Sequence, residues 1–543
     1  MFSELFSIIG MWDYIIVGAG SAGCAVAGRL SESGRHRVLL LEAGPSDRNV
    51  WIRMPIGYGR TFYEPRVNWM YETEPVSGFA GRISYWPRGK VLGGSSSINA
   101  MVYSRGQESD FAEWEAMGNK GWGWRDVLAA YRRLEDHELG ASELHGSGGP
   151  LHITTIDRHA HPLSRLFIAA AQEAGLAFNP DLNGKTIEGV GLYQITTRAG
   201  FRESAASAYL RKPRANLQVM TDTHVARIIF DGRKAVGAAY QQGGETYVVL
   251  ARREVILSAG AIGSPQLLQL SGIGPAPLLK RHGIGVVRAN AAVGRNLQDH
   301  LCYDFTYRSR APSLNDILRP WHGKLRVGLQ YMMTRTGPLS MSLNQGGGYY
   351  RSHPSRGAPD IQLYFSPLTY ERAPPKTRPL MSPDPFSGFC TSISPCKPKS
   401  AGHLEIRSSD WRTHPAIHPN YLSEAEDVAT MVEAARFLRR LGDAPSFASV
   451  IEMELKPGKA VETDADFARD IAERAYSVFH PVGSCRMGPD PSSSVVDPRL
   501  RVHGIEGLRV IDASIFPTIT SGNTNAPAIM VGEKGASLIL KDA

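Results

Sequence analysis

The stretch that decides the fold is YIIVGAGSAGCAVAGRLSESGRHRVLLLE, residues 14–42. It begins with an apolar run, Tyr14–Val17, and passes through a glycine-rich turn into small and apolar residues at helical spacing. Each glycine suits a separate need. Gly18 makes the turn, Gly20 lets the backbone approach a pyrophosphate, and Gly23 lets the helix pack closely on the strand. The helix N-terminus then offers N–H groups to the phosphates, so we expect a dinucleotide-binding unit.

A second apolar run, Arg37–Leu41, predicts the next strand and ends at Glu42. A carboxylate at this point can bind the ribose hydroxyls of an adenine dinucleotide. The motif does not separate FAD from NAD. From these residues alone, the alternative is a structural strand–helix–strand turn with a surface glutamate.

Size and composition are those of a soluble globular protein with two or more domains. The chain has 543 residues, 42% hydrophobic and 21% charged, and no apolar run reaches the roughly 18 residues of a membrane span. The net charge of +8 is modest and no zinc-finger or basic-aromatic motif is present, so we expect no nucleic-acid partner. Five irregularly spaced cysteines argue against a disulfide framework and favour the cytoplasm. The first ten residues read as an upstream extension, with Met11 as a sensible start.

Further motifs follow along the chain: WPRGKVLGGSSSINAMVY (86–103), GAIGSPQLLQLSGIG (260–274), GRNLQDH (294–300), HPVGSCRMG (480–488) and VIDASIFPTITSGNTNAPAIMVGEK (510–534). Together with the glycine turn, these motifs resemble the glucose-methanol-choline (GMC) oxidoreductases. The resemblance is closest to the FAD-dependent alcohol dehydrogenases and choline dehydrogenase-like proteins. It runs from about residue 11 to the C-terminus.

The resemblance implies an α/β fold (α+β overall) with two domains. A Rossmann-like FAD-binding domain would comprise residues 11–305 and 470–543, with an excursion into the other domain near residues 155–200. Residues 306–469 would form a substrate-binding domain, an antiparallel sheet flanked by helices. Strand-like runs and a helical stretch that fit this domain are residues 361–365, 403–406 and 424–441.

The resemblance also implies which residues bind FAD. Val91 and residues 99–102 would contact the flavin, Val225 the adenine, and Asp512, after an apolar strand, would face the cofactor. Some relatives attach FAD covalently through a histidine where this chain has Ile98, so we expect non-covalent FAD. Without the resemblance, the loop of paired glycines and three serines reads as an ordinary turn. The complete set expected to bind the cofactor is Gly18, Gly20, Ser21, Ala22, Gly23, Glu42, Ala43, Trp69, Arg88, Val91, Gly93, Gly94, Ser95, Asn99, Ala100, Met101, Val102, Val225, Ala259, Asp512, Ala513 and Asn525.

Alcohol oxidation by a flavin needs a base for the hydroxyl proton, and histidine suits this role because its ordinary pKa leaves it mostly neutral at pH 7. His480 matches the family's catalytic histidine. Asn523 matches a position that relatives fill with Asn or His, where its amide can hydrogen-bond the alcohol oxygen. Asn525 is close by, and we assign it to the flavin, an assignment that the spacing leaves open by one step.

Other reactive side chains read as structural. His403, His414 and His418 lie in a strand-and-turn segment without a cysteine or carboxylate at matching spacing, so we expect no metal. Cys485 has no basic partner in the sequence and reads as a small buried apolar residue.

Charge suggests the substrate class. Residues 301–400 contain 13 basic and five acidic residues, and such a surround would repel a cationic alcohol such as choline. We therefore expect a neutral, primary aliphatic or aromatic alcohol. The dehydrogenase resemblance favours a quinone or dye-like acceptor. The alternatives are an oxidase that uses O₂ and forms H₂O₂, a flavin-containing lyase, and a non-catalytic flavin-binding protein.

A membrane contact is a further hypothesis. The run LRVGLQYMM (325–333) follows Trp321 and is flanked by Lys324, Arg326 and Arg335. This pattern suits docking on an anionic membrane, where a quinone resides. The alternative is a solvated basic face over an ordinary core helix. The protein would thus be cytoplasmic, with membrane association as an addition.

Overall fold

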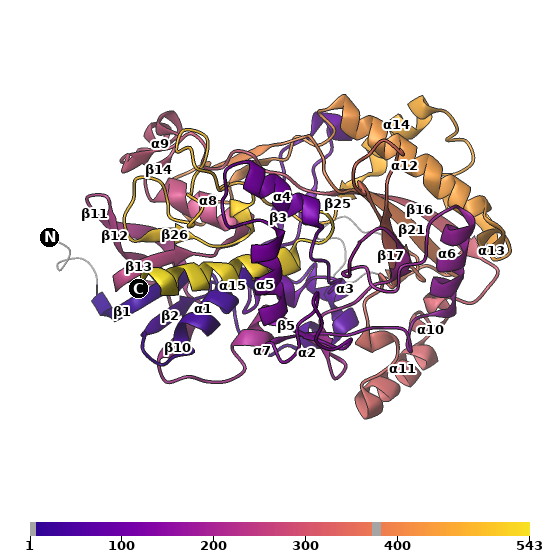
Figure 1. Ribbon diagram of the computed structural model, residues 1–543, viewed down its shortest axis with the longest axis horizontal. Coiled ribbons are helices and arrows are strands. Elements are labelled where there is room, and N and C mark those ends of the chain that lie inside the picture. Colours follow the sequence, from indigo (N-terminus) through magenta and orange to yellow (C-terminus); the bar gives the residue numbers. More distant parts are fainter. Residues whose placement is uncertain (1–6, 372–381) are drawn as a thin grey trace.

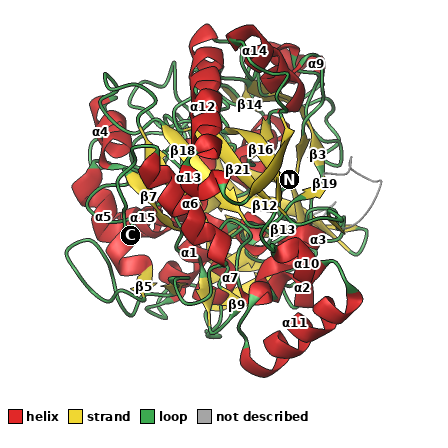
Figure 2. Ribbon diagram, turned by 90° about the vertical axis from the view of Figure 1, so that its right-hand side faces the viewer, coloured by secondary structure: helices red, strands yellow, loops and turns green. Residues whose placement is uncertain are grey.

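The computed structural model describes residues 7–371 and 382–543. Two seven-stranded sheets, one mainly parallel and one antiparallel, lie toward opposite ends of an elongated molecule (Figure 1). Helices cover both sheets (Figure 2). This arrangement confirms the expected α/β fold, with a dinucleotide-binding unit and an antiparallel sheet flanked by helices.

The first sheet carries the glycine turn. Strands β10, β2, β1, β13 and β26 are parallel to their neighbours, whereas β13, β12 and β11 form an antiparallel meander. Residues 14–17 and 38–41 are buried, as expected for parallel strands covered on both faces. The strand bounds are β10 (Leu217–Met220), β2 (Val38–Leu41), β1 (Ser7–Val17), β13 (Glu245–Leu257), β12 (Lys234–Gln242), β11 (His224–Asp231) and β26 (Leu508–Val510).

Helices from the two ends of the sequence cover one face of this sheet. Helices α1 (Ser21–Ser31) and α15 (Asn525–Asp542) pack against each other, and α8 (Gly260–Leu270) lies above them in Figure 1. The contact is close at Gly532, where an added Cβ would lie 2.6 Å from the carbonyl oxygen of Ala22. A side chain at this position would force the two helices apart.

The first strand is longer than the sequence predicted. We expected Tyr14–Val17, but β1 begins at Ser7, and Ser7 and Ile8 pair with Tyr247 and Val248 of β13. The residues before Met11 therefore extend a strand. The long partner β13 supplies the pairing edge, with irregularities in register that the apolar pattern did not reveal.

The second sheet is antiparallel throughout, in the order β24, β16, β21, β18, β17 and β7, with β25 paired to β16. Helices α6, α12 and α13 pack on the sheet and on one another, and α14 packs on α12. The bounds are β24 (Ile451–Lys456), β16 (Leu301–Ser309), β21 (Gly388–Pro395), β18 (Ile361–Ser366), β17 (Gly346–Tyr350), β7 (Gly189–Leu192), β25 (Tyr476–Ser477), α6 (Pro162–Glu173), α12 (Ala425–Asp443), α13 (Pro445–Ala448) and α14 (Asp464–Arg474).

The chain passes between the two layers inside regular elements. Helix α6 and strand β7, from the expected excursion near 155–200, belong to the second layer. The boundary expected at residue 306 falls inside β16, and the one at 470 falls inside α14. The strand expected at 403–406 is β22 (His403–Glu405), which pairs only with β23 (Ala416–His418) and packs on α8 of the first layer.

Short elements connect these layers. The remaining helices are α2 (Val50–Arg53), α3 (Tyr58–Thr61), α4 (Glu108–Ala116), α5 (Trp124–Leu134), α7 (Ala205–Tyr209), α9 (Ala276–Arg281), α10 (Leu314–Leu318) and α11 (Trp321–Thr334). The short strands are β3 (Tyr71–Glu72), β4 (Tyr85–Trp86), β5 (Glu135–His137), β6 (Leu151–Ile153), β8 (Thr197–Arg198), β9 (Phe201–Arg202), β14 (Ile273–Gly274), β15 (Arg288–Ala289), β19 (Tyr370–Glu371) and β20 (Ser382–Pro383). Among the residues that the structure describes, no helix has the length and apolarity to cross a membrane.

Candidate active site

Two adjoining cavities lie at the carboxyl end of the parallel strands. The first, of about 180 Å³, borders the glycine turn, the end of β2 and the start of α8. The second, of about 360 Å³, borders residues 98–102 and His480. The cavities are neighbours, because six residues line both: Ser21, Arg88, Ser95, Pro481, Ala513 and Ala528.

The glycine turn has the geometry that a pyrophosphate needs. Gly18 has a φ of +99°, and an added Cβ would lie 2.5 Å from the carbonyl oxygen of Ser258. An added Cβ at Gly23 would lie 2.0 Å from the Gly18 oxygen, so helix and turn touch there. At Gly20 the nearest atom would be 3.7 Å away, which leaves the backbone open to the first cavity. Gly18 and Gly23 thus shape the turn, and Gly20 leaves room for a ligand.

Glu42 is fixed at the edge of the first cavity by backbone groups. Its carboxylate accepts hydrogen bonds from the Ala19 and Gly44 N–H groups, each at 2.9 Å. Burial raises the pKa of Glu42 to about 7, against the lowering effect of these bonds. Hydroxyl donors from a ribose would stabilise the carboxylate in this setting, so the residue suits the expected ligand.

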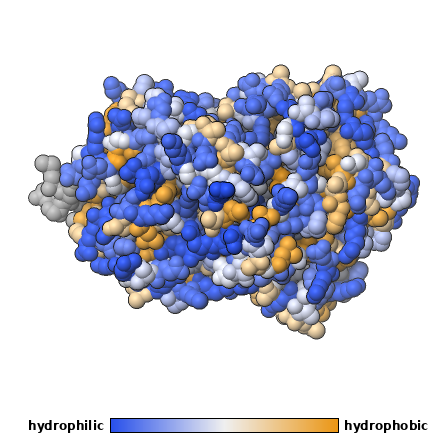
Figure 3. Space-filling model, viewed as in Figure 1, coloured by the Kyte–Doolittle hydropathy of each residue, from blue (hydrophilic) through white to orange (hydrophobic). Residues whose placement is uncertain are grey.

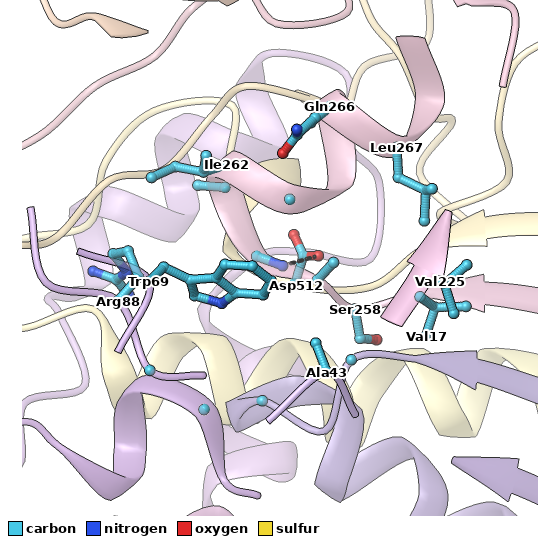
Figure 4. Close-up of a pocket in the computed structure, with 18 of the residues that line it drawn as sticks. Val17, Ala43, Trp69, Arg88, Val225, Ser258, Ile262, Gln266, Leu267 and Asp512 are labelled. Carbon is cyan, nitrogen blue, oxygen red and sulfur yellow. Dashed lines mark hydrogen bonds between the residues drawn. The ribbon is translucent and has the colours of Figure 1, made fainter. Parts of the chain in front are cut away.

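Aromatic rings form the far wall of the first cavity. The rings of Trp69 and His224 are 5.4 Å apart, and those of His224 and Trp411 are 4.0 Å apart. Val225, which the resemblance placed beside the adenine, follows His224 at the start of β11 and faces the same space as Trp69 (Figure 4). Sequence reasoning missed His224 and Trp411. The adjacency of His224 to Val225 was the available signal.

Asp512 ties the C-terminal segment to α8. Its carboxylate accepts from the Gly260 N–H at 2.9 Å and from the Ser264 hydroxyl at 2.6 Å, and also from the Ser514 N–H. Figure 4 shows the side chain between α8 and the cavity. Burial raises the pKa of Asp512. The bonds from Gly260 and Ser264 join residues 252 and 248 positions apart at one end of the first cavity.

His480 lies in the second cavity between two polar partners. Its Nδ1 is 3.0 Å from Nδ1 of His300, and its Nε2 is 3.2 Å from the amide nitrogen of Asn523. The backbone N–H of His480 donates to Asp299 at 2.7 Å. Burial, followed by the neighbouring His300 and Arg88, lowers the pKa of His480 well below its ordinary value. The imidazole is therefore neutral at neutral pH.

The hydrogen-bond partners of His300 and His480 determine which ring nitrogen of each histidine carries a proton. His300 Nε2 lies 2.9 Å from the carbonyl oxygen of Cys396, which can only accept, so this nitrogen carries the proton. Burial lowers the pKa of His300 to about 4, so its other nitrogen is an acceptor. His480 Nδ1 must then donate to His300, and His480 Nε2 carries the ring's lone pair, which accepts from the Asn523 NH₂. Sequence reasoning missed His300, although it closes the quoted motif GRNLQDH.

Asn523 and Asn525 point to different places. Gln362 of β18 donates to the Asn523 side-chain oxygen at 3.1 Å, which turns the Asn523 NH₂ toward His480. Asn525 instead accepts from the Ser21 hydroxyl at 2.8 Å, at the start of α1. The two asparagines therefore contact different groups, and Asn523 is the one beside the histidine.

Most of the expected site residues line the two cavities. Gly23, Val91 and Gly93 do not: the Val91 side chain packs with Ile52 and Val67, and the Gly93 N–H donates to the Ala19 oxygen. Those on the first cavity are Gly18, Gly20, Ser21, Ala22, Glu42, Ala43, Trp69, Arg88, Gly94, Ser95, Val225, Ala259, Asp512 and Ala513. Those on the second are Ser21, Arg88, Ser95, Asn99, Ala100, Met101, Val102, His480, Ala513, Asn523 and Asn525.

The second cavity extends beyond His480 into an aromatic chamber. Among the described residues that line it, the charged side chains are Arg82 and Arg88, and none is a carboxylate. Several of the 13 basic residues in 301–400 form ion pairs away from this cavity, such as Lys397 with Glu113 at 2.7 Å. Residues 372, 376 and 378 of that count lie outside the described part of the chain. The aromatic lining residues are Tyr58, Phe62, Tyr63, Tyr85, Tyr364, Tyr370, Tyr476 and Phe479.

The other reactive residues have structural surroundings. The rings of His403 and His418 stack at 4.6 Å, and His414 packs on Tyr71 at 4.6 Å. Cys485 is buried, and burial raises the pKa of its thiol well above its ordinary value. In the described part of the chain, no three His, Cys, Asp or Glu side chains are grouped as metal ligands would be.

Comparison with known proteins gives consistent matches along the chain. Family models described as GMC oxidoreductase match residues 12–302 and 398–532. An alcohol dehydrogenase [acceptor] from Pseudomonas putida is 43% identical over 98% of this chain and 96% of its own length. Human mitochondrial choline dehydrogenase is 41% identical, covering 97% of this chain and 89% of its own. The crystal structure of pyridoxine 4-oxidase from Mesorbium loti superposes with a TM-score of 0.87 at 32% identity, covering 97% of this chain and 99% of that one.

Proposed function

The chain belongs to the GMC oxidoreductase family and is an FAD-dependent enzyme that acts on alcohol CH–OH groups. We propose that its substrate is a neutral primary alcohol, which is oxidised to the aldehyde. In this proposal His480 is the base that accepts the hydroxyl proton. The observation that carries the proposal is the hydrogen-bond chain from Cys396 through His300 to His480. It leaves the lone pair of His480 Nε2 in the second cavity. A neutral imidazole with this lone pair is equipped to accept a hydroxyl proton.

The residues around the base divide the work. Asn523 offers an N–H to an alcohol oxygen that takes the place of the His480–Asn523 contact, and Gln362 holds the amide in that orientation. As the proton moves to His480, charge builds on the alcohol oxygen, and hydride loss from the carbon becomes easier. Bound FAD supplies the acceptor for that hydride. His300 accepts from His480 Nδ1 throughout and keeps the ring in one tautomer.

The lining of the second cavity supports a neutral substrate. A cationic alcohol such as choline would face Arg82 and Arg88 without a described carboxylate to offset them. Aromatic rings can bind a quaternary ammonium group, so choline, the substrate in the name of the human relative, is the competing choice. We favour aliphatic or benzylic alcohols because most of the large side chains that line this cavity are aromatic, and its charged side chains, Arg82 and Arg88, are both positive.

We also propose that FAD is held without a covalent bond. Ile98 lines the second cavity, and its side chain has no atom that can form such a link. The residues that would hold the cofactor are those lining the two cavities, with Gly20 beside the pyrophosphate, Glu42 at the ribose and Asn525 near the flavin. Glu42, buried with a raised pKa, would gain from hydroxyl donors there.

We propose that the electron acceptor is a quinone or dye-like molecule; the Pseudomonas relative is named a dehydrogenase with an unspecified acceptor. O₂ is the alternative, since the structural relative is named an oxidase. A lyase or a non-catalytic flavin protein would also keep the fold, but neither would transfer a hydride to the flavin, so alcohols would not bleach its colour. The five cysteines, all in the described part of the chain, form no disulfide, which fits the proposed cytoplasmic enzyme.

The experiment is anaerobic mixing of the purified flavoprotein with a panel of alcohols, with His480→Ala as the variant. We expect bleaching of the flavin by aliphatic or benzylic alcohols, faster than by choline. The reduction rate should fall by roughly 10²–10⁴-fold in His480→Ala, with the flavin retained. Under air, a dye should be reduced faster than peroxide forms. Unchanged flavin reduction in the variant would refute the base, and faster bleaching by choline would refute the substrate class.

A further inference from the structure

Helix α11 presents an apolar face to solvent. Its buried residues are Gly323, Val327 and Tyr331, on one side. The other side carries large apolar side chains with high exposed fractions, a set that we name the apolar stripe: Trp321 (75%), Leu325 (54%), Leu329 (47%), Met332 (64%) and Met333 (79%). Their spacing of three to four residues places them along one face of the helix. The stripe is thus the opposite of the usual polar outer face.

The concentration of exposed apolar residues on α11 is unusual for this molecule. Of the 16 large hydrophobic side chains that are exposed among the described residues, five belong to this one helix. The others are scattered, which is ordinary for a protein surface. Helix α11 also projects from an edge of the molecule (Figures 1 and 2). Apolar side chains reach the surface at the lower right of Figure 3, where Figure 1 places this helix.

Basic residues flank the stripe. Arg319, Lys324, Arg326 and Arg335 are exposed, and residues 319–335 contain no aspartate or glutamate. Arg319, Lys324 and Arg326 form no ion pair with any described residue. At about 100° per residue, Lys324 and Arg326 lie on the two opposite borders between the buried side of the helix and the apolar stripe. An apolar stripe bordered by positive charge complements a surface that is itself apolar and anionic.

The apolar stripe and its basic borders favour one partner over another. A second copy of the chain, joined by two-fold symmetry through the same face, would place the basic residues of both copies against each other. An anionic bilayer instead offers acyl chains to the stripe and phosphates to the basic residues. Trp321, at the N-terminal end of the stripe, is of the type that favours the membrane–water interface.

We propose that the apolar stripe and its flanking basic residues dock this protein on the surface of an anionic lipid bilayer. The contact would be peripheral, with α11 lying in the plane of the interface. Helix α10 contacts α11, and Leu314 of α10 packs in one cluster with Tyr58 and Leu343, which line the second cavity. Helix α10 therefore connects α11 with the wall of the second cavity. Neither the base nor the substrate class is needed for this proposal.

The test is co-sedimentation of the FAD-loaded full-length protein with two kinds of vesicle, phosphatidylcholine alone and phosphatidylcholine with phosphatidylglycerol. We expect the wild type to pellet with the anionic vesicles at low salt and to be released as salt is raised. Lys324→Glu with Arg326→Glu should weaken that binding by roughly tenfold or more, because each lost basic contact contributes about 1 kcal/mol. Leu325→Gln with Leu329→Gln should weaken it at every salt concentration.

Matched controls are exposed residues elsewhere: Lys212→Glu for charge and Leu139→Gln for apolar surface. Both should bind like the wild type. Retained flavin colour shows that each variant is folded. The proposal is overturned if the wild type does not bind anionic vesicles, or if the α11 variants bind as well as the controls. A wild-type dimer that Leu325→Gln with Leu329→Gln converts to a monomer would also overturn it, because the stripe would then be covered by a second copy.

Discussion

The Nδ1 atoms of His300 and His480 face each other at 3.0 Å, so one proton is shared between two nitrogens that both belong to neutral rings. The Cys396 carbonyl oxygen accepts a hydrogen bond from His300 Nε2 at 2.9 Å, so the one ring proton of neutral His300 lies on that nitrogen. This leaves the shared proton on His480. The main-chain oxygen of Cys396, 96 positions from His300, thus determines through His300 which nitrogen of His480 can act as a base.

His300 is therefore a positioning residue. In His300→Leu, His480 loses its Nδ1 acceptor and can adopt the other tautomer, so kcat should fall by roughly tenfold or more while KM changes little. His300→Gln, whose side-chain oxygen can accept from His480, should recover much of the rate. Stopped-flow flavin reduction measures both. Equal losses in the two variants would mean that His300 acts only through packing.

The two asparagines provide a matched pair. Asn523→Ala removes a donor at His480 and should slow flavin reduction, though by less than His480→Ala, because Asn523 orients the alcohol and transfers no proton. Asn525→Ala removes the partner of Ser21 and should weaken FAD retention instead. Reduction rates and flavin content after dialysis give the two readouts. The reverse pattern would exchange the proposed roles.

The pH dependence of reduction should reflect the buried histidine. Protonated His480 cannot accept a proton, and burial lowers its pKa well below the ordinary 6.5. The rate should therefore stay on its plateau as pH falls through 6.5 and decline only at lower pH. Asp299, which holds the His480 N–H and whose pKa burial raises to about 6, is the other group that titrates there. Asp299→Asn removes it, so a decline near pH 6 that disappears in this variant belongs to Asp299. A decline centred at 6.5 or above in both proteins contradicts the prediction.

The cofactor should leave the unfolded chain. Because Ile98 cannot form a covalent link, acid or heat precipitation should release all the flavin colour into the supernatant. Absorbance of the supernatant and the pellet measures this directly. Ile98→His serves as a comparison, since it restores a side chain capable of attachment. Colour that stays with the wild-type pellet would rule out non-covalent binding.

The parts of this molecule that could be predicted from sequence are those set by short-range patterns. The turn at Gly18 and the carboxylate at Glu42 depend on residues within one strand–helix–strand unit, so their spacing carries the information. The stretch 424–441 was also predicted as a helix, and α12 occupies Ala425–Asp443.

Contacts between distant segments could not be read in the same way. His300 and His480 are separated by 180 positions, and nothing local indicates that their rings meet. The apolar stripe of α11 was visible as a pattern, but Val327 and Tyr331 supply a second apolar side at similar spacing. Periodicity alone therefore did not tell which side faces the core. The same limit applied to β1, whose first residues are held by pairing to β13 and not by their own hydrophobicity.

The packing of α15 on α1 sets an order for synthesis on the ribosome. Helix α1, which follows the glycine turn, is made at the beginning of translation, yet the helix that covers it is made after more than 500 residues have been joined. Until then, the apolar side of α1 and the edge of β13 that receives β26 have no partner. The nascent chain therefore exposes apolar surface and an unpaired strand edge for most of its synthesis, and we expect chaperones to bind it there. Flavin loading belongs at the end of translation, when Asp512 and Asn525 reach the cavities.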